Sequence, residues 1–284
     1  MQMKLEDVRN VLVLGAGTMG LRIGLQAALS GYQVTIYDIN DHAFAAAQKI
    51  QPAILKHLEK IGKYTHEQGQ EALARIRFTT DAADAAKDAD LVSESVFEDL
   101  NVKKEVWMKF GKLCPAKTVF TTNTSYMLPS WFAAETGRPE RFCAFHFHDV
   151  FQAVVVDVMP HAGTEPWIVD LLMELGKKLE QVPVFVHKEN SGYITNAMLV
   201  ALVGAAGALL TGGVATYEDI DKSWKGNFGM NGPFEILDKV GLDTAWHITK
   251  TLPDAKSKKF ADLLKTFVDA GKLGIKTKQG FYTY

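Results

Sequence analysis

Residues 10–20 read NVLVLGAGTMG, and this stretch restricts the possible folds more than any other part of the chain. A short run of valine and leucine predicts a buried strand, and a GxGxxG motif follows it directly and opens a helical pattern. Glycines there permit a tight turn and a close approach of the backbone to a pyrophosphate, which the helix N-terminus attracts. The stretch therefore predicts a dinucleotide site that begins with Gly15, Gly17, Thr18, Met19 and Gly20.

The strand expected at 33–38 ends in Asp38. A carboxylate at this point can accept hydrogen bonds from both ribose hydroxyls and repels a 2′-phosphate, which favours NAD over NADP. The alternative is that Asp38 only caps the following helix, although Asn40 is also able to do so.

The strand pattern recurs through the first two thirds of the chain. Short segments rich in β-branched or aromatic residues alternate with helical stretches, at 10–15, 33–38, 89–96, 117–123, 142–147, 154–159 and 183–188. This alternation predicts an α/β fold with a Rossmann-like, doubly wound, mostly parallel sheet, and places 154–159 near the sheet edge.

After residue 188 the pattern becomes helical. Helices are expected at 192–210, 217–225, 233–250 and 257–270. We therefore expect an NAD-binding domain over 1–187 and a smaller all-helical domain over 188–284, with a hinge at 188–192. The Ala, Gly and Leu content of 197–213 suits tight packing against a helix of the same chain or of a second subunit.

Composition excludes several classes of partner. The chain has 284 residues, a formal net charge of −2 and no basic excess, so we expect neither a nucleic-acid nor a membrane partner. No apolar signal core or membrane-length run is present. Cys114 and Cys143 lie outside any CxxC pattern, which predicts buried thiols and a cytoplasmic protein.

Residues 144–159, AFHFHDVFQAVVVDVM, raise a separate question. Asp157 interrupts an apolar strand, and an isolated buried charge is unfavourable unless it has a partner. His146, His148 and Asp149 superficially resemble a metal site, but no further ligand at a telling spacing follows, so we expect no metal.

Several further motifs resemble the 3-hydroxyacyl-CoA dehydrogenase family over nearly the whole length, in order and in spacing. They lie at 93–107, 122–130, 145–147, 190–200, 231–243 and 272–284. The resemblance implies a Rossmann-like NAD domain, a helical domain through which the protein forms homodimers, and a role in fatty acid metabolism. It also implies the interconversion of (S)-3-hydroxyacyl and 3-ketoacyl thioesters, here short-chain ones such as 3-hydroxybutyryl-CoA.

The resemblance also implies roles for single residues. The family's catalytic histidine falls on His146, and its active-site serine falls on Ser125, which follows Asn-Thr and lies 21 residues earlier. The asparagine that begins the helical domain falls on Asn196. Taken singly, Ser125 also suits a turn, and Asn196 also suits a helix interior. The residues expected beside the cofactor are Glu98, Lys103 and Asn123.

Oxidation of an alcohol by NAD needs a base for the hydroxyl proton, and histidine titrates in the right range. A buried carboxylate on the other ring nitrogen fixes its tautomer. We expect Asp157 to be this partner, although the family has a glutamate placed one residue later. A shorter loop at 148–153 preserves the direction of Asp157, whereas a deletion inside the strand reverses it. A purely structural carboxylate is the alternative.

The sequence leaves more than one class of substrate open. Phosphate groups of CoA can contact the basic helix at 49–63, or its lysines (Lys49, Lys56, Lys60 and Lys63) form only a solvated face. The loop 148–153 departs from the family pattern, and Tyr126 is a further hydroxyl for the cleft. Free hydroxy acids, sugar acids or diketones are therefore alternative substrates. An inactive NAD-binding relative and the β-hydroxyacid dehydrogenases, which use a lysine in the helical domain, are less favoured.

Overall fold

The computed structural model describes residues 2–284, with the side chains at 46 and 48 left out. The described chain divides into two compact units after Ile194. The expected domain boundary, between residues 187 and 188, lies just beyond the last strand of the first unit. Residues 188–194 form the connection into the first helix of the second.

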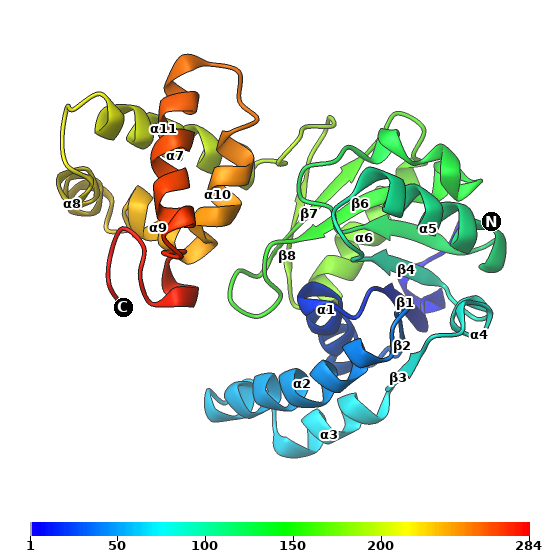
Figure 1. Ribbon diagram of the computed structural model, residues 1–284. Helices are drawn as coiled ribbons and strands as arrows, with labels where there is room; N and C mark the ends of the chain where they lie inside the picture. Colours follow the sequence, from blue (N-terminus) through cyan, green and yellow to red (C-terminus); the bar gives the residue numbers. More distant parts are fainter. Residues whose placement is uncertain (1) are drawn as a thin grey trace. The chain divides into compact units, whose positions relative to one another are not determined.

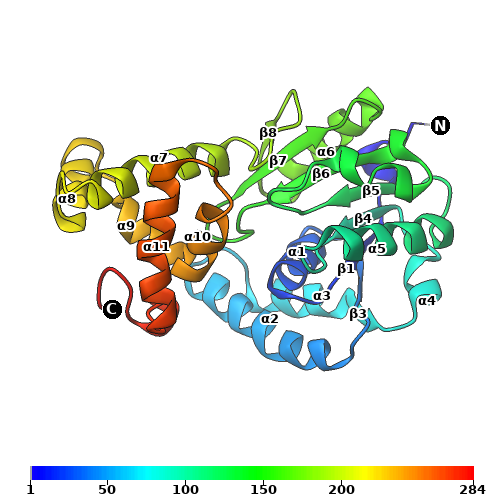
Figure 2. The ribbon, with the colours of Figure 1, turned by 45° about the horizontal axis from the view of Figure 1, so that its top comes forward.

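The first unit contains an eight-stranded sheet in the order β3-β2-β1-β4-β5-β6-β7-β8 (Figures 1 and 2). All neighbouring strands are parallel except β6 and β7. The sheet is therefore doubly wound and mostly parallel, as predicted. The strands are β1 Asn10–Leu14, β2 Gln33–Tyr37, β3 Ile76–Thr79, β4 Leu91–Glu94, β5 Val119–Thr122, β6 Phe142–Phe147, β7 Val155–Pro160 and β8 Val182–Phe185.

Helices cover both faces of this sheet. They are α1 Thr18–Leu29, α2 His42–Lys60, α3 His66–Ala74, α4 Ala82–Ala86, α5 Leu100–Leu113 and α6 Pro166–Lys178, with short 3-10 turns at Leu5–Asp7, Pro129–Trp131, Ala134–Thr136 and Pro139–Arg141. Alternate residues of β1 enter different cores: Val11 and Val13 pack with α1 and α6, whereas Leu12 and Leu14 pack with α4 and α5. Because both faces are buried, these strands are almost continuously apolar in sequence.

Two elements differ from the sequence prediction. β3 was not predicted, because its apolar residues alternate with Arg77 and it lies at the edge of the sheet, only partly buried. The helix expected over 233–250 is divided by Gly241, which has φ +101° and separates α9 from α10.

The second unit is all-helical, as predicted, and has its own core. Its helices are α7 Thr195–Thr211, α8 Tyr217–Phe228, α9 Pro233–Val240, α10 Leu242–Thr249 and α11 Ala255–Asp269, with a 3-10 turn at Ile275–Thr277. Phe234, Phe260 and Phe281 are buried at its centre. Within this unit α7 packs against α11, and Gly207 of α7 lies directly against the Phe260 ring. None of the helices in the described chain has both the length and the hydropathy of a membrane span.

Candidate active site

The glycine motif connects β1 to α1 at the carboxyl end of the sheet. Gly15 has φ +100°, and a Cβ on Gly20 would lie 1.9 Å from the Gly15 carbonyl oxygen, so neither position accepts a side chain without a shift of the backbone. A Cβ on Gly17, in contrast, would meet no atom within 4 Å. Thr18 begins α1 without a side-chain cap and is exposed, and Met19 packs against the core. The open space and the free amides suit a pyrophosphate.

Asp38 lies directly after β2 and braces this turn. One of its carboxylate oxygens accepts a hydrogen bond from the Ala16 amide at 2.8 Å, and the other accepts one from the Asn40 amide at 3.1 Å. Asn40 in turn accepts one from the amide of His42, where α2 begins. Asp38 also lines a cavity of about 420 Å³ together with Gly15, Gly17 and apolar side chains from the segments after β2 and β4.

An ion-pair network is centred on the buried Lys103 and includes the segment after β4. The Lys103 side chain on α5 is 1% exposed, and its Nζ lies 2.7 Å from Glu94 Oε1 and 3.1 Å from Glu98 Oε2. Glu98 also accepts hydrogen bonds from the Thr124 hydroxyl and the Ser125 amide. Lys103 therefore holds Glu98, and Glu98 holds the turn that carries Ser125.

Sequence reasoning missed Glu94, although it is a charge at the end of an apolar strand and could have been found as Asp157 was. It is fully buried, and its oxygens accept hydrogen bonds from the Val96 amide, Lys103 and the Thr122 hydroxyl.

Asn123, directly after β5, accepts a hydrogen bond from the Phe147 amide at 2.8 Å and so fixes the end of β6.

His146 lies near the end of β6, and each of its two ring nitrogens has a hydrogen-bond partner. Its Nε2 lies 3.2 Å from Ser125 Oγ, and its Nδ1 lies 3.2 Å from Asp157 Oδ2. In the antiparallel β6–β7 pair His146 is directly opposite Asp157, so the two side chains share one face of the sheet. The structure thus brings together His146, Ser125 and Asp157.

Burial and hydrogen bonding set the charge states of this pair. Burial on its own raises the pKa of Asp157, but the hydrogen bonds from His146 and His148 outweigh it and hold that pKa below its ordinary value. Burial lowers the pKa of His146, and the hydrogen bond to Asp157 only partly opposes this lowering. At neutral pH an anionic Asp157 therefore faces a neutral His146 whose Nδ1 carries the proton and whose Nε2 is free to accept one.

Tyr193 forms one wall of the site and was also missed. Its ring stacks on His146 with centroids 4.5 Å apart and planes 7° apart, and its hydroxyl donates to the Thr124 carbonyl at 2.8 Å. Burial raises the pKa of Tyr193 well above its ordinary value, so the hydroxyl keeps its proton. In the structure Gly192 and Tyr193 both have positive φ, which is unusual for a tyrosine and is not visible in the sequence.

The loop between β6 and β7 is tied to the cofactor helix. Asp149 pairs with Arg22 of α1, and its other oxygen accepts hydrogen bonds from the amides of Phe151 and Gln152. The loop 148–153 therefore has its own internal turn and an anchor on α1.

The remaining predicted residues lie elsewhere. Asn196 is in the first turn of α7 in the second unit. Lys49, Lys56, Lys60 and Lys63 are exposed on α2 and just after it, and Lys63 pairs with Glu180. Tyr126 is half-buried after Ser125, and burial raises its pKa.

His146, His148 and Asp157 are the group of potential metal ligands found in the described part of the chain, with ligand atoms within 4.8 Å of one another. Their mutual hydrogen bonds account for these atoms without an ion. The absence of a metal stays a prediction.

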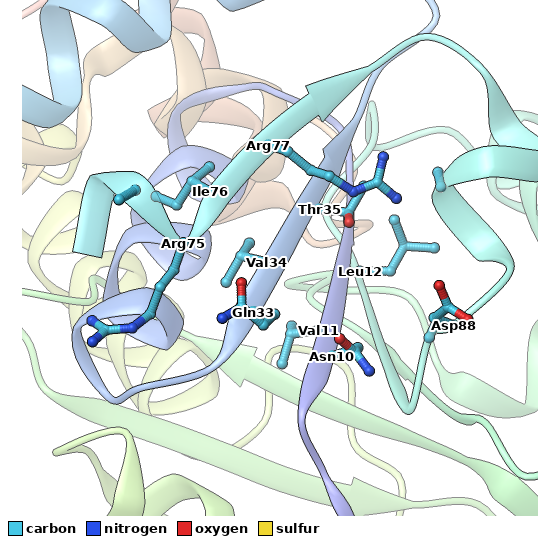
Figure 3. Close-up of a pocket in the computed structure, with 13 residues that line it drawn as sticks. Asn10, Val11, Leu12, Gln33, Val34, Thr35, Arg75, Ile76, Arg77 and Asp88 are labelled. Atoms are coloured by element: carbon cyan, nitrogen blue, oxygen red, sulfur yellow. The ribbon is translucent and has the colours of Figure 1, made fainter. Parts of the chain in front are cut away.

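Another cavity, of about 300 Å³, lies over the amino ends of β1, β2 and β3 (Figure 3). Asn10, Gln33, Arg75, Arg77 and Asp88 surround it. Arg75 pairs with Glu71, and Arg77 pairs with Asp84. Ligands of open α/β sheets bind at the carboxyl ends of the strands, so this cavity is separate from the active site.

Fold and site together define an NAD-binding, Rossmann-like dehydrogenase with a histidine–carboxylate pair. Family models agree: that of the 3-hydroxyacyl-CoA dehydrogenase NAD-binding domain matches residues 10–190, and that of the C-terminal domain matches residues 192–284. The chain belongs to the 3-hydroxyacyl-CoA dehydrogenase family, whose members are NAD-dependent oxidoreductases.

Individual relatives are similar along their whole length. The 3-hydroxybutyryl-CoA dehydrogenase of Clostridioides difficile is 33% identical, over 96% of this chain and 98% of its own. The solved (S)-3-hydroxybutyryl-CoA dehydrogenase of Ralstonia eutropha is 31% identical with a TM-score of 0.88, over 98% of this chain and 99% of its own. A solved diketoreductase, described as acting on dicarbonyl compounds, is 42% identical with a TM-score of 0.92, over 98% and 99%.

Proposed function

We propose that the protein interconverts short-chain (S)-3-hydroxyacyl-CoA and 3-ketoacyl-CoA thioesters, such as 3-hydroxybutyryl-CoA, with His146 as the general base and acid. The observation that carries this proposal is the arrangement of His146, with Nδ1 on a buried carboxylate and Nε2 beside the Ser125 hydroxyl.

In the oxidative direction the substrate hydroxyl takes the place of Ser125 Oγ as the hydrogen-bond partner of His146 Nε2. That nitrogen accepts the hydroxyl proton, and the resulting imidazolium is stabilised by anionic Asp157. Bound NAD supplies the hydride acceptor. In the reductive direction protonated His146 returns the proton from Nε2 to the forming alkoxide oxygen.

Other residues position the reacting atoms. The Ser125 hydroxyl is a donor to the substrate oxygen, and Asn196 keeps the donor role that the family resemblance implies. For the cofactor, we assign the pyrophosphate to the turn of Gly15, Gly17, Thr18, Met19 and Gly20. We assign the ribose to Asp38. Glu98, Lys103 and Asn123 are assigned to the nicotinamide end, with Lys103 acting through Glu98.

The experiment that tests the catalytic assignment compares wild type with His146→Ala and Ser125→Ala in NADH oxidation with acetoacetyl-CoA. We expect His146→Ala to lower kcat by about a hundredfold to ten-thousandfold, the range of general acid–base catalysis. Turnover of His146→Ala equal to that of wild type would exclude His146 as the acid and would favour a different acid–base group.

A second candidate is the same chemistry on a dicarbonyl or hydroxy acid without CoA. It is favoured by the 42% identity to the diketoreductase and by the short, anchored loop at 148–153. Acetoacetyl-CoA, free acetoacetate and a simple diketone, assayed side by side at equal concentration, decide between the two. A higher kcat/KM for the thioester supports the first candidate, and a higher value for either free carbonyl compound supports the second.

We also propose a homodimer through the helical unit and a cytoplasmic location. On α7 only Val203, Ala206 and Gly207 are buried, although the helix is apolar all round. Met198, Leu209 and Phe228 are exposed in the same unit, which is typical of an uncovered interface. The location is supported by two buried, free thiols. Sedimentation analysis with and without Met198→Glu tests the dimer.

A further inference from the structure

A single oxygen of the Asp157 carboxylate is the hydrogen-bond partner of two histidines. His146 Nδ1 lies 3.2 Å from Asp157 Oδ2, and His148 Nε2 lies 2.8 Å from the same atom. Because the carboxylate is anionic and can only accept, both ring nitrogens must donate a proton. The shorter contact belongs to His148, although His146 is the residue beside Ser125.

The strand register explains how both rings reach one carboxylate. His146 is directly opposite Asp157 in the β6–β7 pair, and His148 follows two residues later on the same face. A diagonal neighbour across a ladder lies farther away, but a long side chain can span that distance. The imidazole of His148 does so, and its ring lies 4.7 Å from that of His146, centroid to centroid. The His148 side chain is 12% exposed and that of Asp157 is 1% exposed.

We propose that His148 is a positioning residue that holds Asp157 and limits the support Asp157 gives to His146, so that His146 is a weaker base than a histidine with a carboxylate of its own. The proposal rests on the proposed function, in which His146 is the acid–base residue. His148 acts only through Asp157 and touches no reacting atom.

The physical reason is competition for one acceptor. A carboxylate oxygen that accepts two N–H groups stabilises a charge on either donor less than it would if it accepted one. A charge-assisted N–H···O contact is ordinarily about 2.7–2.9 Å, a length reached by His148 but not by His146. Together these effects favour neutral His146, the form that accepts a hydroxyl proton.

Other charged or titratable groups also face this pair. Asp157 comes from β7, Glu98 from the segment after β4, and Tyr193 from the segment before α7. Beside His148, Asp149 is paired with Arg22 of α1. None of these groups is itself altered by a substitution at His148, so variants at this position can be compared with the other charges unchanged.

The test uses the full chain and two substitutions. His148→Phe removes the hydrogen bond and keeps a ring, whereas His148→Gln keeps a side-chain N–H that does not titrate. His161→Gln is the matched control, because His161 also makes a contact through Nε2, at 2.9 Å to the Pro139 carbonyl, and follows the end of β7 that is farther along the chain from the loop 148–153. If the phenylalanine is not accommodated, His148→Ala gives the same comparison.

Two readouts are needed. The first is the pH dependence of kcat in both directions. The second is an NMR titration of the His146 ring in the unliganded protein. For His148→Phe we expect the His146 pKa to rise by about one unit, which moves the acid limb of oxidation and the alkaline limb of reduction to higher pH. For His148→Gln and His161→Gln we expect both limbs to stay near their wild-type positions.

An unchanged His146 titration in folded His148→Phe would overturn the proposal, as would equal shifts in the Phe and Gln variants. The NMR titration does not depend on turnover. Failure of the proposed function would instead appear as undiminished activity of His146→Ala, whatever His148 does.

Discussion

Buried charged residues around the candidate site are paired with one another, and these pairs connect the residues of the site. Asp157 has two histidines, Glu94 has Lys103, and Lys103 connects Glu94 to Glu98. Removal of one member of such a group leaves an uncompensated buried charge or an unsatisfied donor. Single substitutions here therefore test chemistry more sharply than substitutions at the surface.

Asp157→Asn removes the charge that orients and supports His146. We expect kcat to fall by about a hundredfold or more, because an amide oxygen or nitrogen no longer fixes the Nδ1–H tautomer. We expect the acid limb of oxidation to move to lower pH, because the hydrogen bond that His146 donates to anionic Asp157 raises the His146 pKa and its loss lowers it. The pH dependence of kcat checks both effects. Asp170→Asn, at an exposed carboxylate of α6, should change neither.

Asp38→Ala tests the ribose assignment and the brace on the glycine turn. The Ala16 amide loses its acceptor, and a 2′-phosphate is no longer repelled. We expect KM for NAD to rise about tenfold or more with a smaller change in kcat, and the preference for NAD over NADP to shrink. Asp41→Ala is the control, since Asp41 is an exposed neighbour. An unchanged ratio of kcat/KM for NAD to that for NADP would contradict the assignment of Asp38.

At the scale of elements, the sequence predicts those helices and strands whose position is set by the hydropathy pattern of their own residues. Apolar strands with both faces buried, such as β1 and β6, were predicted because the whole run is apolar. β3 was not, because an edge strand with an exposed arginine lacks that pattern. The approach of Ser125 to His146 was predicted from family spacing. The stacking of Tyr193 and the contact of His148 were not, since they depend on how distant segments meet.

The packing of α7 on α11 offers a test with two glycines of one helix. A Cβ on Gly207 would lie 2.4 Å from Phe260 Cγ, whereas a Cβ on Gly204 would meet no atom within 4 Å. We expect Gly207→Ala to destabilise the helical unit by about 1–3 kcal/mol through overpacking. Gly204→Ala should stabilise it by up to about 1 kcal/mol through helix propensity. Guanidinium denaturation followed by circular dichroism measures both, and equal effects of the two substitutions would contradict the packing.

At the scale of the whole molecule, each unit carries its own core, and the chain end is built into the second one. The carboxylate of Asp238 accepts hydrogen bonds from the amides of Phe281 and Tyr282 and from the Tyr284 hydroxyl. Asp221 accepts one from the Tyr282 hydroxyl. The C-terminal segment 272–284 is therefore held in place by side chains of the second unit. The pair of titrating residues in the candidate site, His146 and Asp157, lies in the first unit.

That pair couples the stability of the first unit to pH. The His146 pKa is lower in the folded protein, so below about pH 6.5 the unfolded chain binds a proton that the folded chain resists, and stability falls. The Asp157 pKa is also lower when folded, so its contribution is present above about pH 3.9 and is lost as the pH falls further. Both groups therefore weaken the fold in acid, in successive windows.

We expect the guanidinium midpoint of the first unit to decrease between about pH 7 and pH 5, before ordinary carboxylates titrate. His146→Gln removes the first titrating group, so its midpoint should change less over this range than that of wild type. His66→Gln, at an exposed histidine of α3, should follow the wild-type curve. Tryptophan fluorescence includes the signal of Trp107, which is fully buried against the sheet in this unit, whereas Trp224 and Trp246 lie in the second unit. If the wild-type and His146→Gln midpoints fell in parallel, the acid sensitivity would come from other groups, and a neutral, proton-resistant His146 would be excluded.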